Sequence, residues 1–118
     1  MKLPLIATAV VLRDLGITSV ETAYDRRLLQ AKVYIAQRMG VPLGYGFCWG
    51  LTAPYSEDLM DDAIVILQEG YDGVLKFNRL NQKYANTIRD INALYDPSSA
   101  EDVSKFYSRT AVNLYEQK

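Results

Sequence analysis

The sequence contains no histidine and a single cysteine, Cys48. Without histidine the chain cannot form Ser-His-Asp or Cys-His catalytic groups, and it lacks the commonest acid–base residue near neutral pH and the usual zinc ligand. One cysteine excludes an internal disulfide framework and disfavours a cysteine-based metal site. These absences predict a protein that is not an enzyme and that carries no cofactor and no metal.

The single thiol lies between Phe47 and Trp49, which offer packing surface and no cation of the kind that activates a cysteine. We therefore expect Cys48 to be a buried, structural residue rather than a reactive one.

The chain has little excess charge of either sign. Its 118 residues include 13 Lys and Arg against 14 Asp and Glu, which gives a formal net charge of −1. A dedicated DNA-binding protein usually carries a basic excess, because neutralising phosphates supplies much of its affinity. The balance disfavours nucleic acid as a partner without excluding it. With 49% apolar and 23% charged residues, residues 1–118 are predicted to form one globular domain.

Long hydrophobic runs are also missing. The N-terminal stretch MKLPLIATAVVL has roughly ten mostly apolar residues after its lysine, which is short for a membrane span. Arg13 and Asp14 follow at once, and Gly16 fits the end of a helix. A buried first helix is favoured over an export signal, so we expect a cytoplasmic protein that does not enter the membrane.

Helical periodicity dominates what is present. Breaks at glycine and proline separate five predicted helices, at residues 3–15, 21–39, 56–69, 80–95 and 98–114. Ser56 fits the N-cap of the third of them. A short strand is expected within residues 71–77 and a β-hairpin at about residues 43–53. The predicted fold class is mainly α (α+β), a helical domain with a small winged-helix-like hairpin.

The second of these helices shows a periodic apolar stripe. Its residues, predicted to face the core, are Tyr24, Leu28, Ala31, Ile35 and Met39. Basic residues lie mainly off that stripe, at Arg26, Arg27, Lys32 and Arg38. The simple interpretation is a solvated face. The alternative is a winged-helix regulator in which these four residues contact DNA phosphates.

The stretch GYGFCWG alternates small and aromatic residues. It lacks the lysine and the spacing of a phosphate-binding loop. In a strand, alternation places Tyr45, Phe47 and Trp49 on one face. One interpretation is that these rings cap the helical core, and the other is that at least one is exposed as an anchor for a partner protein.

Four carboxylates, those of Glu57, Asp58, Asp61 and Asp62, occupy the first two turns of the third predicted helix. Asp58 and Asp62 are one turn apart, as two metal ligands could be, but no second ligand cluster accompanies them. A solvated acidic face that complements the helix dipole is favoured, and a carboxylate enzyme with a divalent metal is the weaker alternative.

The order of three motifs resembles the YwgA-like and Panacea (SocA-like antitoxin) group of small bacterial and phage proteins. That group shows a Leu-Gln-Lys-hydrophobic-Tyr helix, an aromatic strand, and Gly-Pro-Tyr-Ser before an acidic helix. The matching residues are Leu29, Gln30, Lys32, Val33, Tyr34, Tyr45, Phe47, Trp49, Pro54, Tyr55, Ser56, Leu59 and Asp62. Two departures are Ala31, inserted between Gln30 and Lys32, and Ala53, which replaces the glycine.

The resemblance implies a helical fold with a winged-helix-like hairpin and no catalytic residues. It also implies a function of neutralising or adapting partner proteins. The leading hypothesis is therefore a small protein-binding module, antitoxin-like, an adaptor or a phage anti-defence protein, whose partner-binding residues are Tyr45, Phe47, Trp49 and Tyr55. The partner's identity and any homo-oligomer are left open.

Overall fold

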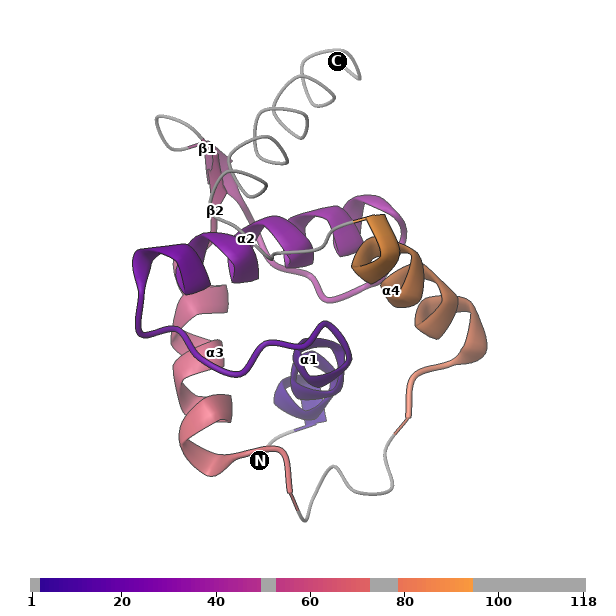
Figure 1. The fold of residues 1–118 in the computed structure, drawn as a ribbon, viewed down its shortest axis with the longest axis horizontal. Helices are drawn as coiled ribbons and strands as arrows, with labels where there is room; N and C mark the ends of the chain where they lie inside the picture. Colours follow the sequence, from indigo (N-terminus) through magenta and orange to yellow (C-terminus); the bar gives the residue numbers. More distant parts are fainter. Residues whose placement is uncertain (1–2, 50–52, 73–78, 95–118) are drawn as a thin grey trace.

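The protein is mainly helical, with one short antiparallel hairpin (Figure 1). The computed structural model describes residues 3–49, 53–72 and 79–94. The elements are α1 (Leu3–Asp14), α2 (Ala23–Arg38), β1 (Cys48–Trp49), β2 (Pro54–Tyr55), α3 (Glu57–Glu69) and α4 (Gln82–Leu94). The predicted α+β class and four of the five predicted helices are confirmed. The fifth helix, at 98–114, lies outside the described residues, as does most of the strand expected at 71–77.

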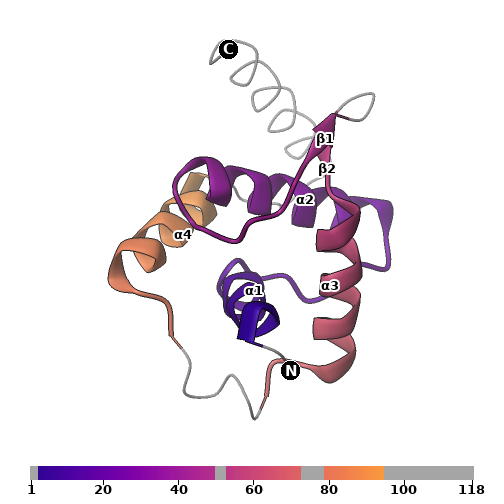
Figure 2. The same ribbon diagram turned by 180° about the vertical axis from the view of Figure 1, so that it is seen from behind.

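Helix α1 lies in the middle of the molecule, framed by α2, α3 and α4 in both views (Figures 1 and 2). Its residues Ala9 to Leu12 are all buried, and so is Leu15 directly after the helix. Helices α3 and α4 pack directly against it. This arrangement explains a sequence that is apolar on most sides, since a helix in the middle of the molecule has few positions left for polar residues. No described helix has both the length and the apolar character needed to cross a membrane.

The C-terminal end of α1 is closed by its own backbone and a glycine. Gly16 adopts a φ of +79°, a conformation that side chains disfavour. The Ile17 amide then donates to the Leu12 carbonyl over 3.0 Å, as in the usual glycine-terminated helix end. The predicted helix stop at Gly16 is confirmed.

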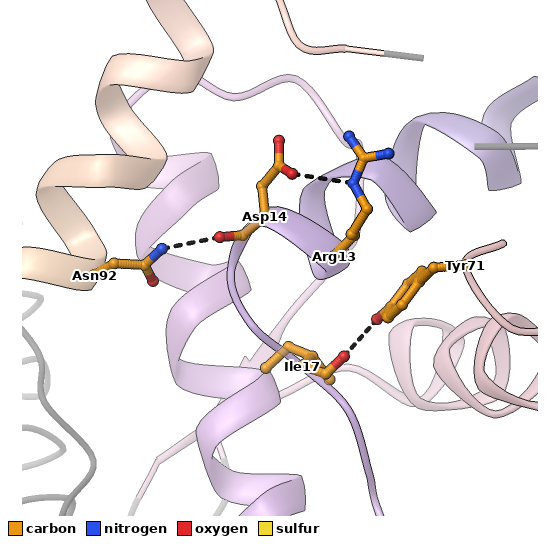
Figure 3. Close-up of polar contacts among 5 residues, drawn as sticks. All are labelled: Arg13, Asp14, Ile17, Tyr71 and Asn92. Atoms are coloured by element: carbon orange, nitrogen blue, oxygen red, sulfur yellow. Dashed lines mark hydrogen bonds and ion pairs between the residues drawn. The ribbon is translucent and has the colours of Figure 1, made fainter. Parts of the chain in front are cut away.

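The carbonyls at this helix end and in the turn after it accept hydrogen bonds from side chains of three other parts of the fold, two of which are drawn in Figure 3. We call these three side chains, Lys32, Tyr71 and Asn92, the α1-terminus network. Asn92 of α4 donates to the Asp14 carbonyl over 2.9 Å. Lys32 of α2 donates to the Leu15 carbonyl over 2.9 Å, and Tyr71, after α3, donates to the Ile17 carbonyl over 2.6 Å. The bond to the Leu15 carbonyl is buried and the other two are partly buried, and each of the three carbonyls gains a donor from outside its own segment.

Lys32 corrects a sequence-based expectation. It was expected on a solvated face, but only 4% of its surface is exposed. Its amine also donates to the Asn92 side-chain oxygen over 3.2 Å. Burial lowers the Lys32 pKa, because desolvation disfavours the charged form. The side chain therefore belongs to the interior and is not available to a DNA phosphate.

Helix α2 is covered on two sides, which explains why its apolar stripe was misjudged. Every residue from Leu29 to Val33 is buried. One side faces the other helices, while Ala31 packs on the opposite side with a small apolar group that includes Ala53 beside the hairpin. Met39, expected at the end of the buried stripe, is 47% exposed. A single-stripe interpretation fails for a helix that lies between two partners.

Replacing Lys32 with alanine should test the α1-terminus network. The Lys32→Ala variant leaves the Leu15 carbonyl without its donor and opens a cavity, so we expect a loss of about 2–4 kcal/mol in the free energy of unfolding. The matched Lys83→Ala change, at an exposed position of α4, should cost less than about 0.5 kcal/mol. Urea denaturation measures both, and equal losses would contradict the proposed role of Lys32.

The alkaline stability of the protein should depend on Tyr71. Burial raises the Tyr71 pKa from its usual value of 10.0 to about 12. The native state therefore holds this proton where the unfolded chain releases it, so the contribution is complete below pH 10 and is lost as the pH rises through about 12. The Tyr71→Phe variant should lose less stability than the wild type between those two pH values in urea denaturation. An unchanged pH slope would contradict this assignment.

Candidate functional site

The hairpin extends away from the helical body in both views (Figures 1 and 2). Strands β1 and β2 are antiparallel, with Cys48 opposite Tyr55 and Trp49 opposite Pro54. A hairpin is present as predicted, but it is displaced from the predicted bounds of about 43–53, because pairing begins only at Cys48 and the second strand is Pro54–Tyr55. The preceding residues, 41–47, form an irregular segment that runs along α2.

The register divides the aromatic residues between the two faces of the hairpin. Opposite residues of an antiparallel pair share a face, so Trp49 lies with Pro54 and Tyr55 lies with Cys48. Trp49 is 39% exposed and Tyr55 is 43% exposed. Cys48 is exposed as well. The expectation of a buried cysteine was wrong, because the hairpin stands away from the core and its Cys48 face is not covered.

Tyr45 and Phe47 have a different role from Trp49. Both are half-buried and pack against the main core. The Phe47 ring meets the Tyr34 ring edge-to-face, with ring centres 5.2 Å apart. The sequence left open whether these aromatics belong to the core or to an interface. The structure places two of them against the core and leaves Trp49 at the surface.

Two glutamines of α2 hold the two arms that lead into the hairpin. The Gln30 side chain donates to the Ser56 carbonyl and accepts from the Ser56 amide, both over 2.9 Å. Gln37 makes the same pair of bonds with Tyr45, at 3.0 and 2.8 Å. A side-chain amide that pairs with both backbone groups of one residue reproduces the pairing of a neighbouring strand. We call these two interactions the glutamine clamps.

Sequence reasoning missed the clamps, although a signal was present. Gln30 and Gln37 are seven residues apart, which places them on one face of α2 two turns apart. Gln30 is only 2% exposed, and a buried glutamine needs partners for its amide. A glutamine within an otherwise apolar stretch next to an irregular loop was the available indication.

Ser56 also begins α3 as predicted. Its hydroxyl accepts a hydrogen bond from the Leu59 amide over 3.2 Å, the geometry of an N-cap. The same residue is held through its backbone by Gln30. The end of the hairpin and the start of α3 are therefore fixed at one point.

A hollow of about 380 Å³ opens between the start of α3 and the segment before β1. Its lining residues are Thr8, Leu43, Gly44, Tyr45, Asp58, Asp61 and Asp62. The Tyr45 hydroxyl donates to the Asp62 carboxylate over 2.6 Å and lies 2.8 Å from the Thr8 hydroxyl. Burial, together with the hydrogen bond to Asp62, raises the pKa of Tyr45 well above its usual value of 10.0. Tyr45 therefore keeps its proton and fixes one wall of the hollow.

The acidic residues do not converge on a point. Within residues 3–49, 53–72 and 79–94, no group of three or more histidine, cysteine or carboxylate side chains could hold a metal ion. Asp62 is engaged with Tyr45, while Asp58 and Asp61 lie exposed on α3. The hollow thus offers a negative surface rather than a set of ligands directed at one ion.

The four basic residues of the DNA-binding alternative do not form one face. Lys32 is buried, whereas Arg26, Arg27 and Arg38 are exposed. Arg26 donates to the Val20 and Glu21 carbonyls before α2, over 3.1 and 3.0 Å. Its guanidinium is thus engaged with the start of its own helix.

The glutamine clamps can be tested at Gln30. In Gln30→Leu the buried amide and carbonyl of Ser56 lose their partners, each at about 1–3 kcal/mol, so we expect a total loss of about 2–4 kcal/mol. The matched Gln68→Leu change at an exposed site of α3 should stay within about 0.5 kcal/mol. Urea denaturation measures stability, and amide hydrogen exchange at Ser56 should accelerate in Gln30→Leu alone. An unchanged exchange rate at the Ser56 amide would contradict the role assigned to Gln30.

Comparisons of the chain with models of known protein families, with curated proteins and with solved structures gave no match. The resemblance to the Panacea group stays a prediction based on the motifs themselves.

Proposed function

We propose that this chain is a small non-enzymatic protein-binding module that binds and neutralises a partner protein in the bacterial cytoplasm. Within that class an antitoxin-like protein, an adaptor or a phage anti-defence protein fits the motif resemblance. The observation that carries the proposal is the pair of exposed aromatic side chains, Trp49 and Tyr55, on a hairpin that extends from the helical body.

The energetics of protein interfaces support this proposal. Tryptophan and tyrosine are enriched among the few interface residues that supply most of the binding free energy. They bury a large area and lose little conformational entropy, since each has only two rotatable side-chain bonds. Exposure of about two-fifths of each side chain leaves area to bury, which favours a partner as the reason for their position.

The glutamine clamps support the proposal in a second way. A recognition segment that is already ordered loses less entropy on binding than a mobile one. Gln37 fixes the arm that enters β1 and Gln30 fixes the arm that leaves β2. We therefore assign Trp49 and Tyr55 to contact with the partner, and Tyr45 and Phe47 to positioning the hairpin.

A protein partner is favoured over DNA. With Lys32 buried, only three of the four predicted phosphate contacts are at the surface. The net charge of −1 gives no general attraction to nucleic acid.

The proposal predicts that hairpin aromatics control partner capture. An affinity pull-down from the native host should recover a specific protein with the wild type, while Trp49→Ala should reduce its affinity by about thirtyfold or more. Thermal unfolding should show that the variant remains folded. Met39→Ala, which truncates an exposed apolar side chain at the end of α2, serves as the matched control and should retain the partner.

Undiminished capture by both Trp49→Ala and Tyr55→Ala would overturn the proposed role of the hairpin. The tagged wild-type chain is compared with each variant at equal concentration. Mass spectrometry of the eluates then identifies the protein whose recovery depends on the hairpin.

A further inference from the structure

Although the chain is nearly neutral, its charged residues are unevenly distributed. Helix α3 holds five of the fourteen acidic residues and none of the thirteen basic ones. Three of the five, Glu57, Asp58 and Asp61, are exposed in its first two turns. The remainder of the chain accordingly carries a basic excess. The side of the molecule formed by α3 is therefore negative, although the molecule as a whole is not.

This acidic surface adjoins the hairpin. Helix α3 begins two residues after Tyr55, and both views show it running directly from β2 into the body of the protein (Figures 1 and 2). Asp58 and Asp61 line the hollow next to Tyr45, and Tyr45 belongs to the clamped segment that enters β1. Exposed aromatics and exposed carboxylates thus lie on consecutive parts of one rigid unit.

Apolar residues continue the same surface along α3. Val65 follows Asp61 by one helical turn and is 41% exposed, and its neighbour Ile64 is 40% exposed. Residues four apart on a helix lie side by side. The outward side of α3 therefore has β-branched apolar residues in its second half, with carboxylates before them and Glu69 after them.

From this arrangement we propose that the hairpin and the outward side of α3 form one docking surface for a basic protein segment, in which lysine or arginine alternates with apolar residues. This inference rests on the proposed function and adds the chemical class of the partner. Charge complementarity carries it, because a segment with both properties matches the carboxylates of α3, the apolar side chains of Ile64 and Val65, and the exposed Tyr55 ring just before the helix.

The geometry favours a basic protein segment over a metal ion. The acidic residues extend over three turns of α3 and, in the described part of the chain, make no three-ligand group. An ion needs ligands around one point, whereas an extended segment meets charges spaced along a helix. A nucleic acid has the same sign of charge as this surface and is repelled by it.

The first test uses a defined probe. A fluorescein-labelled amphipathic peptide of lysine, leucine and alanine is titrated with the full chain at low salt, and its binding is followed by fluorescence anisotropy. The control peptide has glutamate in place of every lysine. We expect the lysine peptide to bind, the glutamate peptide to fail, and the affinity for the lysine peptide to fall as salt is added.

Two double variants with the same charge change locate the binding site. Asp58→Asn with Asp61→Asn should lower the affinity for the lysine peptide by about three- to tenfold, because two charge pairs at an interface rim are lost. Asp72→Asn with Asp90→Asn, at exposed positions outside α3, should leave the affinity unchanged. Both pairs are exposed, and matching thermal unfolding of the two variants shows that each is folded.

The following results would overturn the inference. If both double variants weaken binding of the lysine peptide equally, only net charge matters. If the lysine peptide does not bind the wild type, the proposed docking surface is wrong. A wild-type dimer that Asp58→Asn with Asp61→Asn dissociates, seen by sedimentation velocity, would assign the surface to a second copy of the chain. If partner capture depends on Trp49 but not on Asp58 and Asp61, the proposed function stands and this inference fails. If capture is independent of Trp49 and Tyr55, the proposed function fails first.

Discussion

The C-terminal end of α1, with the turn that follows it, is the constraint on which the rest of the structure depends. A helix end leaves carbonyl groups without intrahelical partners, and each one that is buried unsatisfied costs about 1–3 kcal/mol. The carbonyls of Asp14, Leu15 and Ile17 are buried or partly buried, and other elements supply their donors. Asn92, Lys32 and Tyr71 supply them from α4, α2 and the segment after α3. Three elements are thereby positioned relative to one helix end by directional bonds, in addition to non-directional apolar packing.

Helix α2 connects the end of α1 to the hairpin by hydrogen bonds. Through Lys32 it is bonded to the end of α1, and through Gln30 and Gln37 it is bonded to both arms of the hairpin. Its middle turn carries buried residues on all sides because it lies between the helical core and the hairpin segment. The hairpin is therefore joined to the helical core by directional hydrogen bonds through α2. Ala31 and Ala53, the two positions that depart from the Panacea pattern, pack in one apolar group where the hairpin meets α2.

The proposed binding surface follows from the same framework. Ser56 ends the hairpin and caps α3, so the aromatic side chains and the acidic side of α3 keep a fixed relation. Tyr45 adds a second connection, because its backbone is clamped by Gln37 and its hydroxyl bonds Asp62 of α3. Under the proposed function, a partner that contacts the hairpin also meets the negative surface of α3.

Local patterns in the sequence determined the helices, their glycine ends, the Ser56 cap and the existence of the hairpin, since each depends on residues within a few positions of one another. The tertiary structure alone decided which side chains face outward. Lys32 was expected at the surface and is buried, because its donors serve the end of a helix 17 residues earlier in the chain. Cys48 was expected in the core and is exposed, because the hairpin extends beyond the helices. Trp49 and Tyr45 share an alternating aromatic pattern, yet only the tertiary structure left Trp49 39% exposed on the hairpin and packed Tyr45 against the core.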